Sequence, residues 1–232
     1  MLSDCCRIAP GPTRKRRALR ITGARVTGRY ARRMTSNDPD PQHDTHRLMI
    51  VIASIRQGRG GLSVGRWFEE QAAQHEAFVL DVVDLAELDL PLMTEPNHPR
   101  LQRYTQQHTK AWSARVSAAD AFVFVTPEYN FSFTAPLKNA IDYLSREWAD
   151  KPLGFVTYGG VSGGTRAMVA LLPTLQALRL HPVMPAVNVP FYTQYIEDDV
   201  FSPNEVTIKA ANDMLAALAK ASRTYRRART GR

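Results

Sequence analysis

Short apolar runs alternate along the chain with segments of helical periodicity, beginning at about residue 47. In the first of these runs, Leu48–Ala53, every residue is apolar. Strands that are apolar on both faces are typical of a parallel sheet buried between two layers of helices. We predict five such strands, at residues 48–53, 78–85, 121–126, 153–158 and 183–189.

The segments between the runs repeat apolar residues at the spacing of an α-helix. After the third predicted strand, four apolar residues recur at spacings of four, three and four: Leu137, Ile141, Leu144 and Trp148. A similar stripe at residues 206–218 predicts a last helix, and Pro173 is expected to kink a helix at residues 165–179. Strands and helices that alternate with short connections predict an α/β fold, a doubly wound five-stranded parallel sheet with helices on both faces.

Composition agrees with a soluble globular protein. Of the 232 residues, 44% are hydrophobic and 22% are charged, as in ordinary globular proteins. No run reaches the ~18 apolar residues of a membrane-spanning helix, so we predict a cytoplasmic protein with no membrane partner. The two cysteines, Cys5 and Cys6, are adjacent, which excludes a disulfide framework and a cysteine zinc site.

The formal net charge of +8 comes from the two ends of the chain. Residues 1–46 carry ten basic and four acidic side chains, and residues 220–232 carry six basic and no acidic ones. The remainder, with 14 basic and 18 acidic residues, is slightly acidic. We expect a disordered basic N-terminal extension at residues 1–46, one folded domain at 47–222 and a basic C-terminal tail at 223–232.

The connection after the first predicted strand has the composition of an anion site. Glycines at 58, 60 and 61 allow backbone N–H groups to turn inward, and a helix is expected from about Val64. Ser54, Arg56, Arg59 and Ser63 can add hydroxyl and guanidinium donors. The spacing fits neither the GxGxxG dinucleotide motif nor the Walker pattern. It predicts a phosphate site of another kind, with a flexible surface turn as the alternative.

Two further connections suit a flat ring. The segment after the third strand carries Tyr129, whose ring can face a heterocycle. The exposed backbone of this segment can form hydrogen bonds with the polar edge of that heterocycle. Such a loop can equally belong to the core or to a subunit contact. Residues 159–165, after the fourth strand, contain four glycines, which permit close backbone approach. In an α/β sheet these connections meet at one edge. Together they favour a mononucleotide with a flat ring system, and FMN is the natural candidate.

Three motifs make the chain similar to the NADPH-dependent FMN reductases of flavodoxin-like fold. They are Ala53–Arg56 with Gly58 and Arg59, Thr126–Asn130 continued by Leu137–Leu144, and Tyr158–Gly164. The resemblance covers about residues 47–190. It implies strand order 2-1-3-4-5, non-covalent FMN, NADPH or NADH as reductant, and a homodimer or a tetramer made of dimers.

The resemblance also assigns FMN contacts by position. The phosphate contacts are Ser54, Arg56, Arg59, Leu62 and Ser63, the ring contacts are Pro127, Glu128, Tyr129 and Asn130, and the opposite side is closed by Gly159, Gly160 and Ser162. The chain departs from the family's usual pattern at three positions. Ala53 replaces a glycine, Phe131 replaces a small or imidazole side chain, and Thr134 replaces a proline.

The chemistry expected from this combination is carried by the flavin. A flavin enzyme needs no side-chain nucleophile or acid–base pair, and the sequence contains no convincing Ser/His/Asp set or metal-ligand cluster. We therefore predict an FMN-dependent NAD(P)H oxidoreductase that passes a hydride from NAD(P)H to FMN and then reduces flavin, quinone or another small acceptor. No catalytic side chain and no metal ligand is assigned.

Two alternatives from other classes remain at this point. A flavodoxin-type electron carrier would bind FMN without turning over NAD(P)H, but such carriers are usually more acidic than residues 47–219. A nucleic-acid-binding module would use the basic ends of the chain. Known nucleic-acid-binding signatures are not apparent, so no nucleic-acid partner is predicted.

Overall fold

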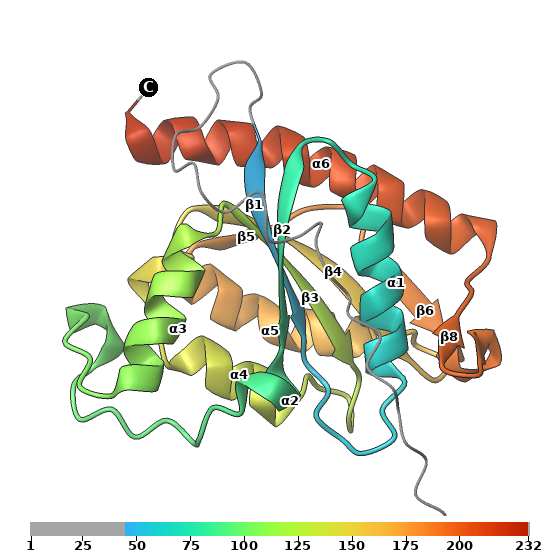
Figure 1. The fold of residues 1–232 in the computed structure, drawn as a ribbon, viewed down its shortest axis with the longest axis horizontal. Coiled ribbons are helices and arrows are strands. Elements are labelled where there is room, and N and C mark those ends of the chain that lie inside the picture. Colours follow the sequence, from blue (N-terminus) through green and yellow to red (C-terminus); the bar gives the residue numbers. More distant parts are fainter. Residues whose placement is uncertain (1–44, 232) are drawn as a thin grey trace, which may run out of the picture. The chain divides into compact units, whose positions relative to one another are not determined.

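The computed structural model describes residues 45–231. In chain order the elements are β1 (His46–Ile52), α1 (Gly61–Ala73), β2 (Phe78–Asp84), α2 (Leu85–Leu88), η1 (Pro99–Leu101), α3 (Gln107–Ala118), β3 (Ala121–Pro127), α4 (Ala135–Asp142), η2 (Arg146–Trp148), β4 (Lys151–Gly159), α5 (Thr165–Leu178), β5 (Leu180–Pro182), β6 (Val187–Pro190), η3 (Tyr192–Tyr195), β7 (Ile196–Glu197), β8 (Val200–Phe201) and α6 (Glu205–Thr230). Figure 1 shows these elements, with η denoting short 3-10 helices.

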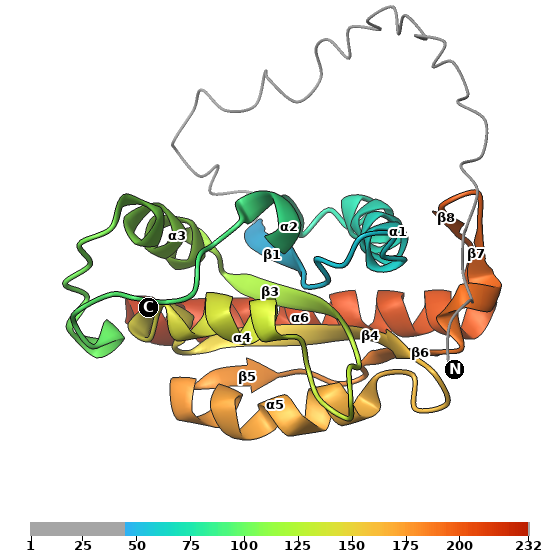
Figure 2. The ribbon, with the colours of Figure 1, turned by 90° about the horizontal axis from the view of Figure 1, so that it is seen from below.

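The main sheet is parallel and has the predicted flavodoxin-like order. Its strands lie in the order β2-β1-β3-β4-β5, and β6 also pairs with β4. Figure 2 shows the sequence of strands from β1 to β5 across the sheet. The first four predicted strands are confirmed to within a few residues at each end.

Helices cover both faces of the sheet, and the alternation of side chains along each strand separates two cores. Leu48 and Ile50 pack with α1 and α6, whereas Met49 and Val51 pack with α3, α4 and α5. All four side chains are buried because β1 is a central strand. This arrangement explains why the strand is apolar at every position rather than at every second one.

The fifth predicted strand, residues 183–189, is confirmed only at its C-terminal end. β5 ends at Pro182, and β6 begins at Val187. Pro185 lies in the interruption and has no N–H group to donate to the ladder with β4. The prediction was therefore wrong for residues 183–186, and it missed β5, which precedes the predicted range. Both β5 and β6 pair with β4.

The stripe predicted as one helix also has two parts. α4 ends at Asp142, and Trp148 belongs to η2, but the four stripe residues all reach the same core. The Trp148 indole N–H donates to the carbonyl of Ile141 at 3.2 Å, which ties the second part to the first. Thr134, the residue that replaces a proline, caps α4 by accepting from the N–H of Leu137.

The C-terminal residues continue the last helix. α6 runs to Thr230, so residues 223–230 are helical where a separate tail was expected. Arg229 donates to the carbonyl of Asp150 at 2.7 Å and to the carboxylate of Asp120 at 3.1 Å, which fixes this end against the sheet. Basic residues at a helix C-terminus also complement the helix dipole. The expectation for residues 1–44 lies outside the described residues.

A buried carboxylate holds the start of α3. Glu95 accepts from the N–H of Thr105 at 2.9 Å and from the N–H of Gln106, the capping residue of α3, at 3.0 Å. Burial alone would raise the pKa of Glu95, but these hydrogen bonds outweigh it and lower the pKa to about 2. The ionised carboxylate therefore stabilises the fold, because it pairs with two N–H groups at the entry to α3.

Glu95→Gln should remove an acid-sensitive part of the stability. A carboxylate whose pKa is lowered in the folded state stabilises it above the unfolded value of about 4.3, and this contribution is lost as pH falls through about 2. Urea unfolding at pH 7, 4 and 3 should show the wild type losing stability over this range and the variant losing less. Glu76→Gln, at an exposed position, is the matched control. Equal pH profiles for Glu95→Gln and wild type would contradict the assignment.

Candidate functional site

The parallel register brings four connections to one edge of the sheet. Ile52 of β1 is level with Val125 of β3, and Pro127 at the end of β3 is level with Tyr158 of β4. In turn Gly159 is level with Pro190 at the end of β6. The segments that follow β1, β3, β4 and β6 therefore all leave the sheet at its carboxyl edge, where α/β proteins bind ligands.

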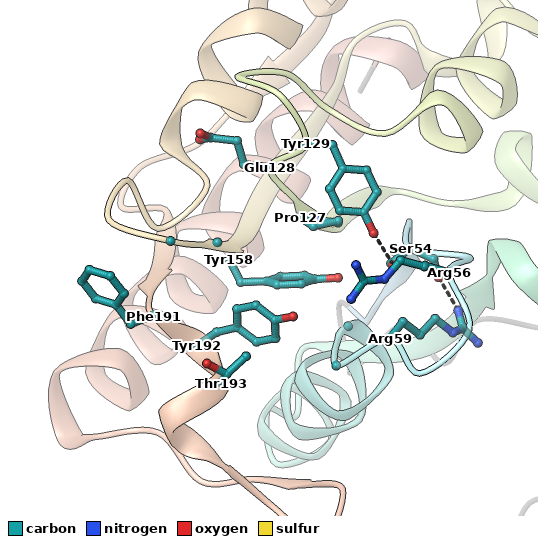
Figure 3. A pocket seen from close by; sticks show the side chains of 14 residues that line it. Ser54, Arg56, Arg59, Pro127, Glu128, Tyr129, Tyr158, Phe191, Tyr192 and Thr193 are labelled. Carbon is teal, nitrogen blue, oxygen red and sulfur yellow. Dashed lines mark hydrogen bonds between the residues drawn. The ribbon is translucent and has the colours of Figure 1, made fainter. Parts of the chain in front are cut away.

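A cavity of about 310 Å³ lies among these segments (Figure 3). Its volume falls within the range typical of small-molecule sites. Eight of the predicted contacts line it: Ser54, Arg56, Arg59, Pro127, Glu128, Tyr129, Gly159 and Gly160. The three connections singled out in the sequence thus share one cavity.

Four predicted residues lie outside the cavity wall. Leu62 and Ser63 are in the first turn of α1, and the Ser63 side chain is buried. Asn130 occupies a left-handed turn position, with φ 49°, at the tip of the connection after β3. Ser162 donates to the carboxylate of Glu128 at 2.7 Å. Their assignment to FMN stays a prediction.

Sequence reasoning missed one side of the cavity. Gly60 and Gly61 also line it and belong to the predicted anion site, but the other additional lining residues were not predicted: Tyr158, Phe191, Tyr192 and Thr193. The last three follow β6, and the rule that ligands lie beyond the carboxyl ends of strands applies to that strand too. The aromatic pair directly after a predicted strand was the available signal. Tyr158 was quoted within a motif but was treated as part of a strand.

One end of the cavity has the features of an anion site. α1 begins at Gly61, three residues earlier than expected, and has neither a side-chain cap nor an acidic residue in its first turn. Its free N–H groups and dipole therefore favour a negative charge. The Arg56 side chain is exposed at this end and has no carboxylate partner among residues 45–231. It is available to a ligand.

Arg59 has a different environment. Its guanidinium forms a two-pronged ion pair with Asp84, both contacts at 2.5 Å, and also donates to the carbonyl of Ser54. The two side chains are 14% and 7% exposed. The Asp84 hydrogen bond outweighs burial and raises the pKa of Arg59. Arg59 therefore ties the segment after β1 to the end of β2, while Arg56 remains free.

Glu128 performs a similar task on the opposite side. Its carboxylate accepts from the Ser162 hydroxyl at 2.7 Å, from the Arg166 N–H at 3.1 Å and from the Arg166 guanidinium at 2.9 Å. Burial alone would raise the pKa of Glu128, but these contacts lower it. Figure 3 shows the carboxylate directed away from the aromatic side chains of the cavity. Glu128 thus holds the glycine-rich segment and the start of α5.

Aromatic and backbone surfaces form the rest of the cavity wall. The Tyr129 hydroxyl and the Ser54 hydroxyl are 3.1 Å apart, which joins the segments after β3 and β1. Tyr158 and Tyr192 pack edge to face, with ring centroids 4.8 Å apart. A Cβ added to Gly160 would meet nothing within 4 Å, so the backbone there is open to a ligand. This combination suits a flat ring joined to a phosphate.

Comparison with known proteins agrees with this geometry. A family model for NADPH-dependent FMN reductase matches residues 46–194, which include every segment that lines the cavity. The chain belongs to the NADPH-dependent FMN reductase family. It is therefore an oxidoreductase that uses FMN and NAD(P)H, as the resemblance implied.

Individual relatives match different shares of this FMN reductase. An NAD(P)H-dependent FMN reductase of Schizosaccharomyces pombe is 38% identical over 149 residues, covering 63% of this chain and 74% of the relative. An NADPH:quinone oxidoreductase of Arabidopsis thaliana is 41% identical over 87 residues, covering 36% of this chain and 42% of the relative.

A solved structure shares the fold. The flavoenzyme NAD(P)H:(acceptor) oxidoreductase FerB of Paracoccus denitrificans superposes with a TM-score of 0.64 and is 21% identical, covering 78% of this chain and 99% of FerB. Among residues 45–231 no group of His, Cys, Asp and Glu is arranged to hold a metal ion. Within the same range, no helix has the length and apolarity needed to cross a bilayer.

Asp84→Asn should weaken flavin binding in this FMN reductase. Asparagine can still cap α2, where Asp84 accepts from the N–H of Ala86, but it leaves Arg59 without its charge partner. Breaking a buried ion pair on one side costs about 3 kcal/mol, and the segment around Ser54 loses an anchor. The expected result is lower stability and weaker FMN affinity, measured by thermal unfolding and fluorescence titration.

Asp81→Asn is the matched control for this substitution. Asp81 lies on the same strand and pairs with Arg115, away from the cavity. It should affect stability without changing FMN affinity. If Asp84→Asn binds FMN as tightly as Asp81→Asn does, Arg59 does not position the segment after β1.

Proposed function

We propose that the cavity at the carboxyl edge of the sheet is the FMN site of an NAD(P)H-dependent oxidoreductase. The observation that supports this proposal is the composition of the cavity wall. The uncapped start of α1 and Arg56, which has no carboxylate partner among the described residues, lie at one end, and the other walls are aromatic rings and open backbone. The phosphate of FMN would lie at the start of α1. The flavin ring would lie between the segments after β3 and β4.

The residues present fit this group. Gly60 and Gly61 leave room beside Tyr192 and Tyr158 that a Cβ would fill, and the Tyr158 hydroxyl is buried without a hydrogen bond among the described residues. An anionic ligand at this end would occupy the space beside the two glycines and would accept a hydrogen bond from the Tyr158 hydroxyl. When bound, FMN supplies the hydride-accepting chemistry, so the protein's own task is binding, orientation and electrostatics.

The chain's residues divide this task in the proposed site. Arg56 and the first N–H groups of α1 would neutralise the phosphate, and the backbone at Gly159 and Gly160 would allow close approach to one edge of the ring. Backbone N–H groups near that edge can stabilise negative charge that develops on reduction. Tyr129 would form a ring wall, and its bond to Ser54 would keep that wall next to the phosphate end.

The second substrate is proposed to be a small oxidant such as a flavin or a quinone. The name of the Arabidopsis relative supports a quinone, and the family description supports a flavin. Tyr129 and Phe191 border the cavity and are partly exposed, so flat acceptors would find aromatic surface at its mouth. Nothing favours an electron carrier without NAD(P)H turnover.

Assembly and location extend this proposal. Large apolar side chains are exposed at Phe131 and Val161, next to segments that line the cavity, and a second copy of the chain would cover them. A cytoplasmic homodimer, or a tetramer made of dimers, is the assembly that we propose.

The absorption spectrum of the purified protein tests the proposed function. The expected result is the visible absorption of bound flavin, which bleaches when NADPH is added without oxygen and returns when a quinone is supplied. An electron carrier would show the flavin absorption without the bleaching. A folded protein that remains colourless after incubation with FMN would contradict the proposal.

Arg56→Ala tests the phosphate end. A hydrogen bond to a charged group contributes about 1.5–3 kcal/mol, so FMN affinity should fall roughly ten- to a hundredfold. Arg66→Ala is the matched control because Arg66 is exposed on α1 and does not line the cavity. Fluorescence titration with FMN measures both variants. Equal affinities for the two would show that the phosphate does not bind beside Arg56.

A further inference from the structure

The Tyr158 hydroxyl is a buried polar group that the fold itself does not use. Tyr158 lies near the end of β4, is 1% exposed, and its hydroxyl forms no hydrogen bond with any of residues 45–231. A buried hydroxyl without a partner destabilises the fold. Most buried polar groups in proteins are paired, so this one calls for an explanation.

Its position points to a ligand. A Cβ on Gly61 would lie 1.9 Å from the Tyr158 hydroxyl oxygen and 3.2 Å from Cβ of Ser54, so the hydroxyl reaches the start of α1 only because residue 61 is glycine. The Ser54 hydroxyl is near enough to act against the burial that raises the pKa of Tyr158, but the two hydroxyls do not have hydrogen-bond geometry, and that of Ser54 is paired with that of Tyr129. Figure 3 shows the hydroxyl end of Tyr158 directed toward the segment that carries Ser54 and Arg56.

We propose that the Tyr158 hydroxyl donates a hydrogen bond to the phosphate of FMN and makes the protein distinguish FMN from riboflavin. This inference rests on the proposed function and deepens it. The phosphate is the one group that FMN has and riboflavin lacks, and its oxygens are strong acceptors. A site with a buried polar donor rejects the analogue that cannot pair with it.

The surroundings keep Tyr158 in the donor form. Burial raises the pKa of Tyr158 far above its ordinary value, so the hydroxyl keeps its proton throughout the physiological range. A phosphate beside it would accept that proton's hydrogen bond while the uncapped N–H groups of α1 and Arg56 supply positive potential. The three donors lie on different elements and converge on one end of the cavity.

The flavin-free protein provides an independent prediction. If the Tyr158 hydroxyl finds its hydrogen-bond partner only in a bound ligand, it is unpaired in the flavin-free protein and destabilises that fold. Tyr158→Phe keeps the ring, which packs against Tyr192, and removes only the unpaired hydroxyl. The variant should therefore unfold at a higher temperature than the wild type without flavin, although it binds FMN less tightly. A hydroxyl with a purely structural role would give the opposite change in stability.

The experiment compares FMN and riboflavin on flavin-depleted wild type and Tyr158→Phe, by fluorescence titration. The FMN dissociation constant of the variant should rise roughly ten- to a hundredfold. The riboflavin constant should stay the same, so the preference for FMN falls by the same factor. Tyr225→Phe is the matched control, since its ring stacks on His181 away from the cavity. It should leave both constants unchanged.

The outcomes separate the two proposals. Unchanged FMN affinity in Tyr158→Phe, or an equal loss of affinity for FMN and riboflavin, would overturn the role of Tyr158 and leave the FMN site in place. A lower unfolding temperature of the flavin-free variant would also overturn it. A folded wild type that binds neither flavin would instead overturn the proposed function itself.

Discussion

The common direction of the strands is the constraint on which the site depends. Because β1, β3, β4 and β6 run parallel and in register, the four segments that follow them emerge at one edge, although they are separated by up to about 140 residues in the chain. No single segment contains a binding site. The N-terminus of α1 provides positive potential, the segments after β3 and β6 provide aromatic rings, and the segment after β4 provides open backbone.

Several charged residues at this edge stabilise the protein segments rather than meet a ligand. Arg59 is paired with Asp84, and Glu128 is paired with Arg166, each through a side chain that is mostly buried. Buried ion pairs of this kind contribute little net stability, but they fix the relative positions of the segments that they join. The site is thereby held in shape before a ligand arrives, which lowers the entropic cost of binding.

The sequence was sufficient to predict the parallel sheet and three of the connections that form the cavity, because fully apolar runs and glycine-rich turns are local signals. The strand order followed from the family resemblance instead. It could not distinguish Arg56 from Arg59, since the difference is made by Asp84, 25 residues further along the chain. The orientation of Glu128 likewise depends on Ser162 and Arg166. The lining residues after β6 were missed although the predicted strand ends within one residue of β6, because the rule that ligands lie beyond strand ends was applied only to the first, third and fourth strands.

The close contact between α1 and the sheet limits how the segment before it can change. A Cβ on Gly65 would lie 2.5 Å from the Ile52 side chain, so the helix rests directly on β1 and cannot move inward. Its first residue, Gly61, is held equally closely by Tyr158. At Gly58, by contrast, a Cβ would meet nothing within 4 Å. The turn at position 58 therefore has open space around it, although its φ of 66° favours glycine, while the two ends of the segment are held by their close contacts with Tyr158 and Ile52.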